Sequence, residues 1–234
     1  MTPARVVSLV PSATESLVAL GSTPVGCTRF CELAGVPTVG GTKNVDVDAV
    51  VALVPDIVIV NDEENRLEDA EALRAHGLVL HSMSPHSIDD VGPSVCALAE
   101  AIGVAAPHPF DEWESWRQRT QVAISTSAFI PIWRRPWMSL AANTYGSSLL
   151  HHLGIVNVFA DAAPRYPEVA LSEVAARAPD VVLLPNEPYE FTERHAREIR
   201  ESVPATRTIL IDGRDLFWWG TRTPAAVERL RGVA

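Results

Sequence analysis

The sequence predicts an α/β fold with two lobes, and three observations support this prediction. Short runs rich in Val, Ile and Leu recur along the chain, they alternate with amphipathic segments, and the plan of the first half returns in the second. Near-continuous apolar strands are typical of parallel sheets that helices cover on both faces. Strands of this kind that alternate with helices predict α/β lobes with mainly parallel sheets.

Five apolar segments have the length and composition of buried strands. They are residues 5–10, 56–60, 78–81, 181–184 and 208–211. Helical patterns lie between these strands, and the clearest are residues 64–75 and 191–202. The order of strands and helices is that of repeated β-α units.

The chain repeats itself in register. Residues 52–66 match residues 176–190, with a Pro-Asp pair ahead of a four-residue apolar run in each. Residues 8–21 resemble residues 139–154, with two residues inserted in the second copy. Both members of the second pair predict a strand, a polar turn, a helix and a glycine at the helix end. Two half-chains of similar plan therefore follow one another.

A helix over 107–128 is expected to connect the two halves. The segment begins with proline and has acidic residues first and arginines later, an order that suits the helix dipole. About 20 helical residues would span roughly 30 Å as a stiff connector. The predicted domains are an α/β lobe over 1–106, this helix, and an α/β lobe over 129–234.

Composition excludes several classes of function. The 234-residue chain has a net charge of −10 and no Lys/Arg run, which argues against a nucleic-acid surface. No apolar run approaches the roughly 18 residues that a membrane span needs, so we expect no membrane insertion, and we expect a monomer. No export signal precedes the first strand. We therefore expect a cytoplasmic protein, with a periplasmic or other extracytoplasmic location as the alternative if a signal has been removed.

The cysteines do not predict a metal site. Cys27 and Cys31 have C-x3-C spacing, unlike the C-x2-C spacing of zinc pairs, and Cys96 is the third. Reduced, unpaired thiols are the simplest interpretation. Among the histidines, only His81 and His86 lie near a strand end, and neither has a clear partner, so we expect no bound metal.

Several stretches resemble a known family. RVVSLVPSATESLVALG, PVGCTRFCE and VGGTKNVDVDAVVALVPDIVIV, together with NDEENR, RYPEV and LFWWGTRT further along, are similar to the cobalamin and siderophore substrate-binding proteins of ABC importers. The resemblance covers essentially the whole chain. It implies two α/β lobes joined by a single long backbone helix, with a ligand cleft between the lobes. It also implies non-catalytic binding of a corrinoid or iron-chelate ligand, with no cofactor required.

The resemblance implies a set of ligand-binding residues that follow the strands of each lobe. They are Ser12, Phe30, Asn61, Glu63, Glu64, Arg66, Tyr145, Tyr166, Asn186, Trp218, Trp219 and Arg222. Importer-type relatives also use one acidic residue on each lobe to dock on the permease. The corresponding positions here are Asp48 and Ser172, with Glu173 beside the latter, which makes permease docking doubtful.

Some of these residues have a structural interpretation as well. In extended structure Trp218 and Trp219 point to opposite sides, so we expect one in the core and one on the cleft, with Arg222 beside it. Ser12 is expected to cap a helix, with Glu15 completing a capping box.

The segment that follows residues 56–60 has two interpretations. Asn61 or Asp62 could cap the next helix, with Glu64 in its first turn. The acidic strand ends could instead bind a polar ligand, or hold the lobes together through Arg66 or Arg222.

Two other classes of function stay open. One is an enzyme or cofactor-handling protein on the same fold, because folds do not determine functions. No G-x-S-x-G, Walker A, G-x-G-x-x-G or H-E-x-x-H motif supports it. The other is an interaction module whose cleft is filled by its own side chains.

Overall fold

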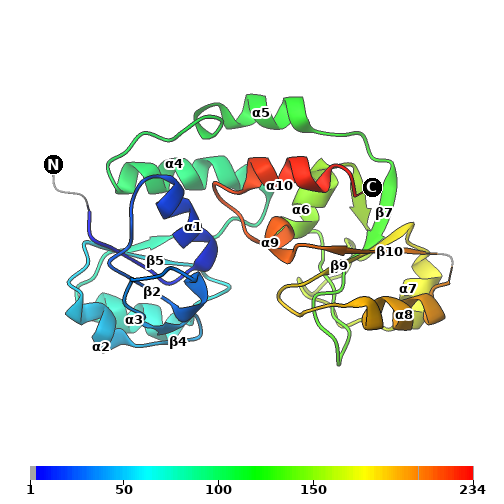
Figure 1. The fold of residues 1–234 in the computed structure, drawn as a ribbon, viewed down its shortest axis with the longest axis horizontal. Coiled ribbons are helices and arrows are strands. Elements are labelled where there is room, and N and C mark those ends of the chain that lie inside the picture. The colour runs from blue at the N-terminus through cyan, green and yellow to red at the C-terminus, as the bar shows by residue number, and fades with distance from the viewer. Residues whose placement is uncertain (1–3, 205, 234) are drawn as a thin grey trace. The chain divides into compact units, whose positions relative to one another are not determined.

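The computed structural model describes residues 4–204 and 206–233, which form two compact units (Figure 1). Each unit is assembled from three stretches of chain. The first unit contains the chain up to Pro85, Asp90–Trp113 and Trp219–Arg222, and the second contains His86–Asp89, Glu114–Trp218 and the chain from Thr223 onward.

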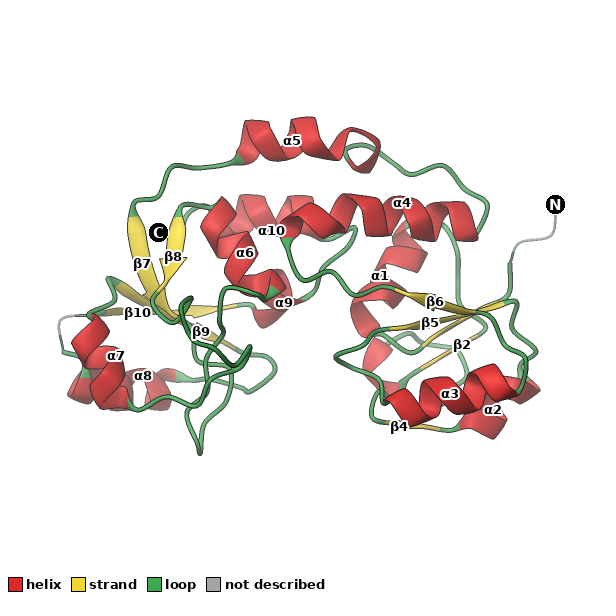
Figure 2. Cartoon of the chain, turned by 180° about the vertical axis from the view of Figure 1, so that it is seen from behind, coloured by secondary structure: helices red, strands yellow, loops and turns green. Residues whose placement is uncertain are grey.

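The first unit is built on a parallel four-stranded sheet of order β2-β1-β5-β6. Its strands are β1 (Val6–Ser8), β2 (Gly26–Cys27), β5 (Ile57–Val60) and β6 (Leu80–Ser82). Helices α1 (Pro11–Ala19) and α4 (Val91–Ala101) cover one face, and α2 (Val47–Ala52) and α3 (Leu67–Ala75) cover the other (Figures 1 and 2). The smaller elements are β3 (Gly40–Gly41), which pairs antiparallel with β4 (Asn44–Val45), and the 3-10 turns η1 (Arg29–Cys31), η2 (Ile88–Asp90) and η3 (Phe110–Glu112).

The second unit is built on a parallel sheet of order β10-β9-β7-β8. Its strands are β7 (Thr126–Phe129), β8 (Ile155–Asn157), β9 (Val181–Pro185) and β10 (Arg207–Ile211). Helices α7 (Leu171–Arg177) and α8 (Glu193–Ser202) cover one face, and α6 (Tyr145–His152), α9 (Gly213–Phe217) and α10 (Thr223–Leu230) the other (Figure 2). The predicted fold class, two α/β lobes with parallel sheets, is therefore confirmed.

The predicted repeat is visible in the sheet topology. Read in reverse, the second sheet is β8-β7-β9-β10, so β9 occupies the place that β5 has in the first sheet. The aspartate of the repeated Pro-Asp pair accepts an equivalent hydrogen bond in each unit. Asp56 accepts a hydrogen bond from Arg5 N at 2.7 Å, and Asp180 accepts one from Ser127 N at 2.7 Å. Each aspartate therefore ties its strand to the start of the central neighbouring strand.

The helix-end glycines of the repeat are also confirmed. Gly21 follows α1 with φ +80° and Gly154 follows α6 with φ +79°. This left-handed conformation favours glycine because it has no Cβ. The strand predicted ahead of the second helix does not form, however. Ser139 and Ala141 donate their N–H groups to Pro167 O and Arg165 O in a neighbouring loop.

Apolar strand residues and the helices over them form the cores. One cluster in the first unit consists of Val7, Leu9, Val39, Val50, Val58, Val60 and Leu73. One in the second consists of Phe129, Phe159, Val169, Val174, Val182, Leu184, Phe191, Ala196, Ile199 and Val203. Strands β1 and β9 are buried along their whole length, which explains the continuous apolar runs there. The burial predicted for 78–81 and 208–211 is wrong, because β6 and β10 are edge strands and are partly exposed.

The expected helix over 107–128 is wrong in length. Helix α5 covers only Trp113–Thr120, preceded by η3, and residues 126–129 are strand β7. Backbone donors beyond α5 are used elsewhere, because Val122 N donates to His152 O and Ser125 N to Gly154 O, each at 2.9 Å. These bonds place the chain alongside the turn that leads into β8, which is incompatible with a continuing helix.

Two capping predictions are also wrong. Helix α1 begins at Pro11 with Val10 at the N-cap, so Ser12 lies inside the first turn and forms no capping box with Glu15. Neither Asn61 nor Asp62 caps the next helix, because helix α3 begins only at Leu67, with Arg66 at the N-cap and no capping side chain.

Candidate functional site: strand-end loops of the two units

The expected ligand-binding residues of the first unit follow three neighbouring strands. Ser12 comes after β1, Phe30 after β2, and residues 61–66 after β5. Because the three strands are parallel, these residues lie at one edge of the sheet, which is the edge where open α/β sheets bind ligands. Ser12 is 3% exposed, and its hydroxyl has no hydrogen-bond partner among the described residues.

The buried side chain of Asn61 holds the loops at this edge together through hydrogen bonds. Its amide Nδ2 donates to Met83 O at 2.8 Å, and its Oδ1 accepts from the N–H groups of Glu63 and Glu64 at 2.8 and 2.9 Å. Asn65 continues the network, since its Oδ1 accepts from Asn61 N at 2.8 Å. The Asn61 side chain therefore folds back a turn and joins it to the loop after β6. It holds the loop in position and does not cap α3.

A cavity of about 230 Å³ opens beside this turn. It is lined by Val60, Asn61, Asp62, Asn65, Arg66, Leu67, Ala70, Arg74 and Ser82. Arg66 holds Asp69 through two hydrogen bonds of 3.1 and 3.0 Å, with about half of its side chain exposed. Arg66, Arg74 and Asp62 thus give the cavity a polar rim.

Glu64 lies half-buried in the turn between Asn61 and Asn65, two residues that line this cavity. Burial raises the pKa of its carboxyl to about 7, the charge of Lys43 opposes the shift, and the charge of Glu63 adds to it. A carboxyl group with this pKa changes its charge near neutral pH, so small changes in the surroundings of Glu64 alter the charge of this edge.

Phe30 presents its ring to solvent at the same edge. It is 49% exposed, and the Arg29 guanidinium lies 4.8 Å from the ring centroid. The ring also lies against Gly41, where a Cβ would be 3.2 Å from it. An exposed aromatic ring with a cation over one face suits stacking on a flat ligand.

In the second unit, the side chains of Tyr145 and Asn186 form hydrogen bonds that stabilise the fold. Tyr145 is buried at the start of α6, and its hydroxyl bonds to Thr223 Oγ1 at 2.9 Å. The Oδ1 of Asn186 accepts from Gly213 N at 2.7 Å and thereby joins the loops after β9 and β10. Tyr166, by contrast, is 37% exposed in the loop after β8.

The two adjacent tryptophans separate as expected into one buried and one partly exposed ring. Trp219 is buried in the first unit, whereas Trp218 is half-buried in the second. Trp218 Nε1 donates to Glu187 Oε2 at 3.1 Å, and the Arg214 guanidinium lies 4.9 Å from its ring. Trp218 is therefore the member of the pair whose ring is partly exposed, and its contact with a ligand stays a prediction. The shared cleft expected from the sequence stays a prediction.

Arg222 has an internal partner that the sequence did not reveal. Its guanidinium donates two hydrogen bonds of 2.8 Å to Glu15 on α1. Thr221 N donates to Ser16 Oγ at 3.1 Å, and Gly220 lies so close to Ser16 that a Cβ would collide with its hydroxyl. Residues 219–222 are thus fastened to α1, and the Arg222 guanidinium is engaged by Glu15.

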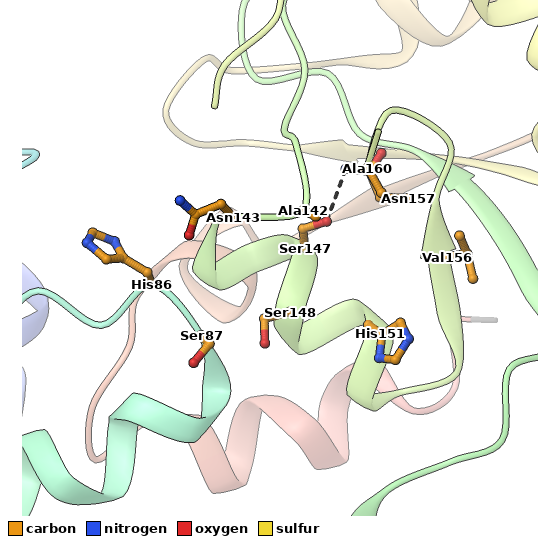
Figure 3. Close-up of a pocket in the computed structure, with 10 residues that line it drawn as sticks. All are labelled: His86, Ser87, Ala142, Asn143, Ser147, Ser148, His151, Val156, Asn157 and Ala160. Carbon is orange, nitrogen blue, oxygen red and sulfur yellow. Dashed lines mark hydrogen bonds between the residues drawn. The ribbon is translucent and has the colours of Figure 1, made fainter. Parts of the chain in front are cut away.

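A second cavity lies in the second unit, with a volume of about 270 Å³ (Figure 3). It is lined by His86, Ser87, Ala142, Asn143, Ser147, Ser148, His151, Val156, Asn157 and Ala160. Asn157 Nδ2 donates to Ser147 Oγ at 3.1 Å, and Ile88 N to Ser148 Oγ at 3.1 Å. Apart from His86, these residues were not singled out from the sequence, although the repeat unit 139–154 contains five of them.

Neither a metal centre nor a membrane span emerges from residues 4–204 and 206–233. This part of the chain gathers no group of three or more His, Cys, Asp or Glu side chains that could hold a metal. Burial lowers the pKa of His81, and its Nε2 lacks a hydrogen-bond partner in the described structure. None of the described helices has the length and apolar character needed to cross a membrane.

Comparison with known proteins gives similarity over the whole chain. No family model matches it. The vitamin B12-binding protein of Vibrio parahaemolyticus is 23% identical over 245 residues, which cover 97% of this chain and 86% of the relative. The vitamin B12-binding protein of Vibrio cholerae is 25% identical over 249 residues, which cover 98% and 87%.

Solved structures show the same fold. The periplasmic vitamin B12-binding protein BtuF of Vibrio cholerae matches with a TM-score of 0.81 at 21% identity, over 98% of this chain and 96% of that one. The periplasmic haem-binding protein RhuT from Roseiflexus matches with a TM-score of 0.81 at 21% identity, over 97% and 96%. Full-length similarity to curated relatives and the shared two-lobed fold agree with the motifs quoted above, so in sequence and in fold the chain is similar to the cobalamin- and siderophore-type substrate-binding proteins of ABC importers.

Proposed function

We propose that this protein binds a corrinoid, or a flat iron chelate such as haem, without performing chemistry on it. The observation that supports this most directly is similarity across 97–98% of the chain to proteins named for vitamin B12 binding. Structural neighbours named for haem binding share the fold and extend the ligand class to other large, flat metal chelates.

Aromatic rings in the strand-end loops fit this ligand class. Phe30, Tyr166 and Trp218 are each at least partly exposed, and each belongs to a loop that follows a parallel strand or the short helix after it. A macrocycle binds mainly by burial of its faces against such rings, and a few polar groups orient its edges. The metal inside a chelate is already coordinated, so the absence of a histidine cluster among the described residues is compatible with this ligand.

Glu64 and Arg66 are the polar anchors we propose for the first unit. Arg66 keeps about half of its side chain exposed while it holds Asp69, and Glu64 has a pKa of about 7. They can meet the amide or carboxylate groups at the edge of a macrocycle. Arg222 is a positioning residue in this proposal, because Glu15 engages its guanidinium and the pair fastens residues 219–222.

A titration tests the proposal. Aquocobalamin, haemin and a ferric siderophore are added separately while tryptophan fluorescence is recorded, followed by gel filtration monitored in the visible range. One of the three should quench the fluorescence with micromolar affinity or better and co-elute as colour. Absence of both signals with all three would refute the proposal.

Variants localise the binding. Phe30→Ala and Tyr166→Ala should each weaken the affinity about tenfold, which corresponds to the roughly 1.4 kcal/mol of one aromatic contact. Val79→Ala is the matched control, because Val79 is exposed at the amino end of β6, away from the proposed site. Equal affinities for all three variants and the wild type would contradict the proposed residues.

We also propose that the protein works outside the cytoplasm and delivers its ligand to a permease. The relatives described by location are periplasmic, and nothing in the comparisons supports the cytoplasmic expectation. Asp48 lies exposed in the first turn of α2, and Glu173 lies exposed in the first turn of α7 and bonds to Arg177 at 3.3 Å. One exposed carboxylate near each of these helix starts supports docking on a basic partner. Charge reversal at both positions should abolish ligand transfer and leave ligand affinity unchanged.

A further inference from the structure

The cavity in the second unit runs along helix α6 (Figure 3). Asn143 lies just before the helix, and Ser147, Ser148 and His151 lie on it. His151 follows the two serines by four and three residues, so the three side chains are neighbours on the surface of the helix. The other lining residues come mainly from the segment before η2 and from β8 with the turn after it. All of them belong to the second unit.

Two hydroxyl groups in this cavity have a proton to donate. Ser147 is 5% exposed, and its Oγ accepts a hydrogen bond from Asn157 Nδ2 at 3.1 Å. Ser148 Oγ accepts one from Ile88 N at 3.1 Å. Neither hydroxyl donates to another of the described residues. A hydroxyl group that donates nothing loses a hydrogen bond that it makes in water, so both serines favour a ligand with acceptor atoms.

The lining of the cavity is polar, and none of the described residues that form it is acidic. It comprises two imidazoles, three serine hydroxyls and two asparagine amides, beside the apolar side chains of Ala142, Val156 and Ala160. The whole chain, by contrast, has 29 Asp and Glu residues and a net charge of −10. A hard cation would need carboxylate or carbonyl ligands, whereas the helix dipole favours a negative charge at the start of α6. The lining therefore suits an anion.

We propose that this cavity binds a small organic anion, whose phosphate or carboxylate oxygens accept hydrogen bonds from Ser147, Ser148 and the His151 ring. The volume of about 270 Å³ is about nine times the share of one water molecule in the liquid, so a carbon skeleton fits beside the anionic group. The apolar side chains of Ala142, Val156 and Ala160 offer contacts to that skeleton. Binding of this anion does not depend on a macrocycle, and it is tested without one.

Chemical shifts of the ¹⁵N-labelled full chain test this site at pH 7 and constant ionic strength. Glycerol 3-phosphate and succinate are the anionic probes, and glycerol is the neutral control that lacks the phosphate. At least one anion should shift the backbone signals of residues 143–151 in a saturable manner, with a dissociation constant in the millimolar range or lower. The Ile88 signal should move with them, because its N–H binds the Ser148 hydroxyl. The anion that binds more tightly identifies the charged group.

Two variants localise the anion. Ser148→Ala should weaken the affinity about tenfold, as expected for the loss of one hydrogen bond to a charged group. Ser125→Ala is the matched control and should bind like the wild type, because Ser125 is exposed before β7 and does not line the cavity.

Three results would overturn the proposal. They are the lack of saturable shifts with both anions, equally strong shifts of the same signals with glycerol, and equal affinities of Ser148→Ala and the wild type. The wild-type titration alone decides the matter if Ser148→Ala fails to fold.

Discussion

His152 makes the stability of the second unit depend on pH. Its side chain is 3% exposed at the end of α6, where Nε2 lies 2.9 Å from Thr120 Oγ1 and the ring stacks on Trp116. Burial lowers the pKa of His152 to about 4, and the charges of Arg117, Arg231 and His151 add to the shift. The folded protein therefore holds His152 neutral, whereas the unfolded chain protonates it near pH 6.5.

The direction and the size of this change in unfolding free energy follow from proton linkage. Because the folded pKa of this base is lowered, its contribution is complete above pH 6.5 and is lost as the pH falls towards 4. Between pH 7 and pH 5 the unfolded chain gains about 0.7 proton at this site, whereas the folded protein gains about 0.1. With pKa values of 6.5 and about 4, the loss is about 2 kcal/mol, at 1.36 kcal/mol per pKa unit.

Urea unfolding at pH 7 and pH 5 measures this loss. The wild type should lose about 2 kcal/mol more unfolding free energy than His152→Gln over this interval, because other titrating groups act equally in both proteins. The exposed neighbour provides the matched control: His151→Gln should keep most of the pH dependence of the wild type, because His151 makes the smallest of the contributions to the His152 shift. Equal pH dependence in the wild type and His152→Gln would refute the reasoning, as would a His152 pKa near 6.5 by NMR.

Three further substitutions test other features of the structure. Gly154→Ala should cost several kcal/mol by thermal unfolding, since its Cβ would lie 2.4 Å from a backbone carbonyl, whereas Gly21→Ala, with similar φ and open space, should cost about 1 kcal/mol. Glu64→Gln should remove the destabilisation that the ionised Glu64 carboxylate causes above about pH 7 and that is relieved as the pH falls to 4.5, because the folded pKa of Glu64 is raised; stability curves that coincide with the wild type would contradict this. Arg222→Ala should cost about 1–2 kcal/mol, and a double-mutant cycle with Glu15→Gln should show coupling; additive costs would argue against the pair.

The strands were predictable because their signal is local. A parallel strand buried on both faces needs four or five apolar residues in a row, and the runs at 56–60 and 181–184 fall on β5 and β9 almost residue for residue. The Pro-Asp repeat was equally visible, and the structure supplies its reason in the bonds of Asp56 and Asp180 to the neighbouring strands. The fold class followed from these patterns.

The site was less predictable because its partners are far apart in the chain. Glu15 and Arg222 are 207 residues apart, and no local pattern connects them. Ser12 and Glu15 have the spacing of a capping box, yet the helix starts one residue before Ser12, and Glu15 turns to Arg222. The end of α5 was hidden for the same reason, because the bonds of Val122 and Ser125 go to a turn some 30 residues later. Tertiary competition for hydrogen bonds decided each of these positions.

The attachment of residues 219–222 to α1 governs the order in which the chain can mature during synthesis. A nascent chain that ends at Trp113 already has the strands of the first sheet, but Glu15 and Ser16 await partners that are synthesised more than 200 residues later. The first unit therefore completes its packing only after residues 219–222 have left the ribosome. A nonsense mutation at Trp219 would remove these partners and thereby also damage the packing of α1, which is synthesised early.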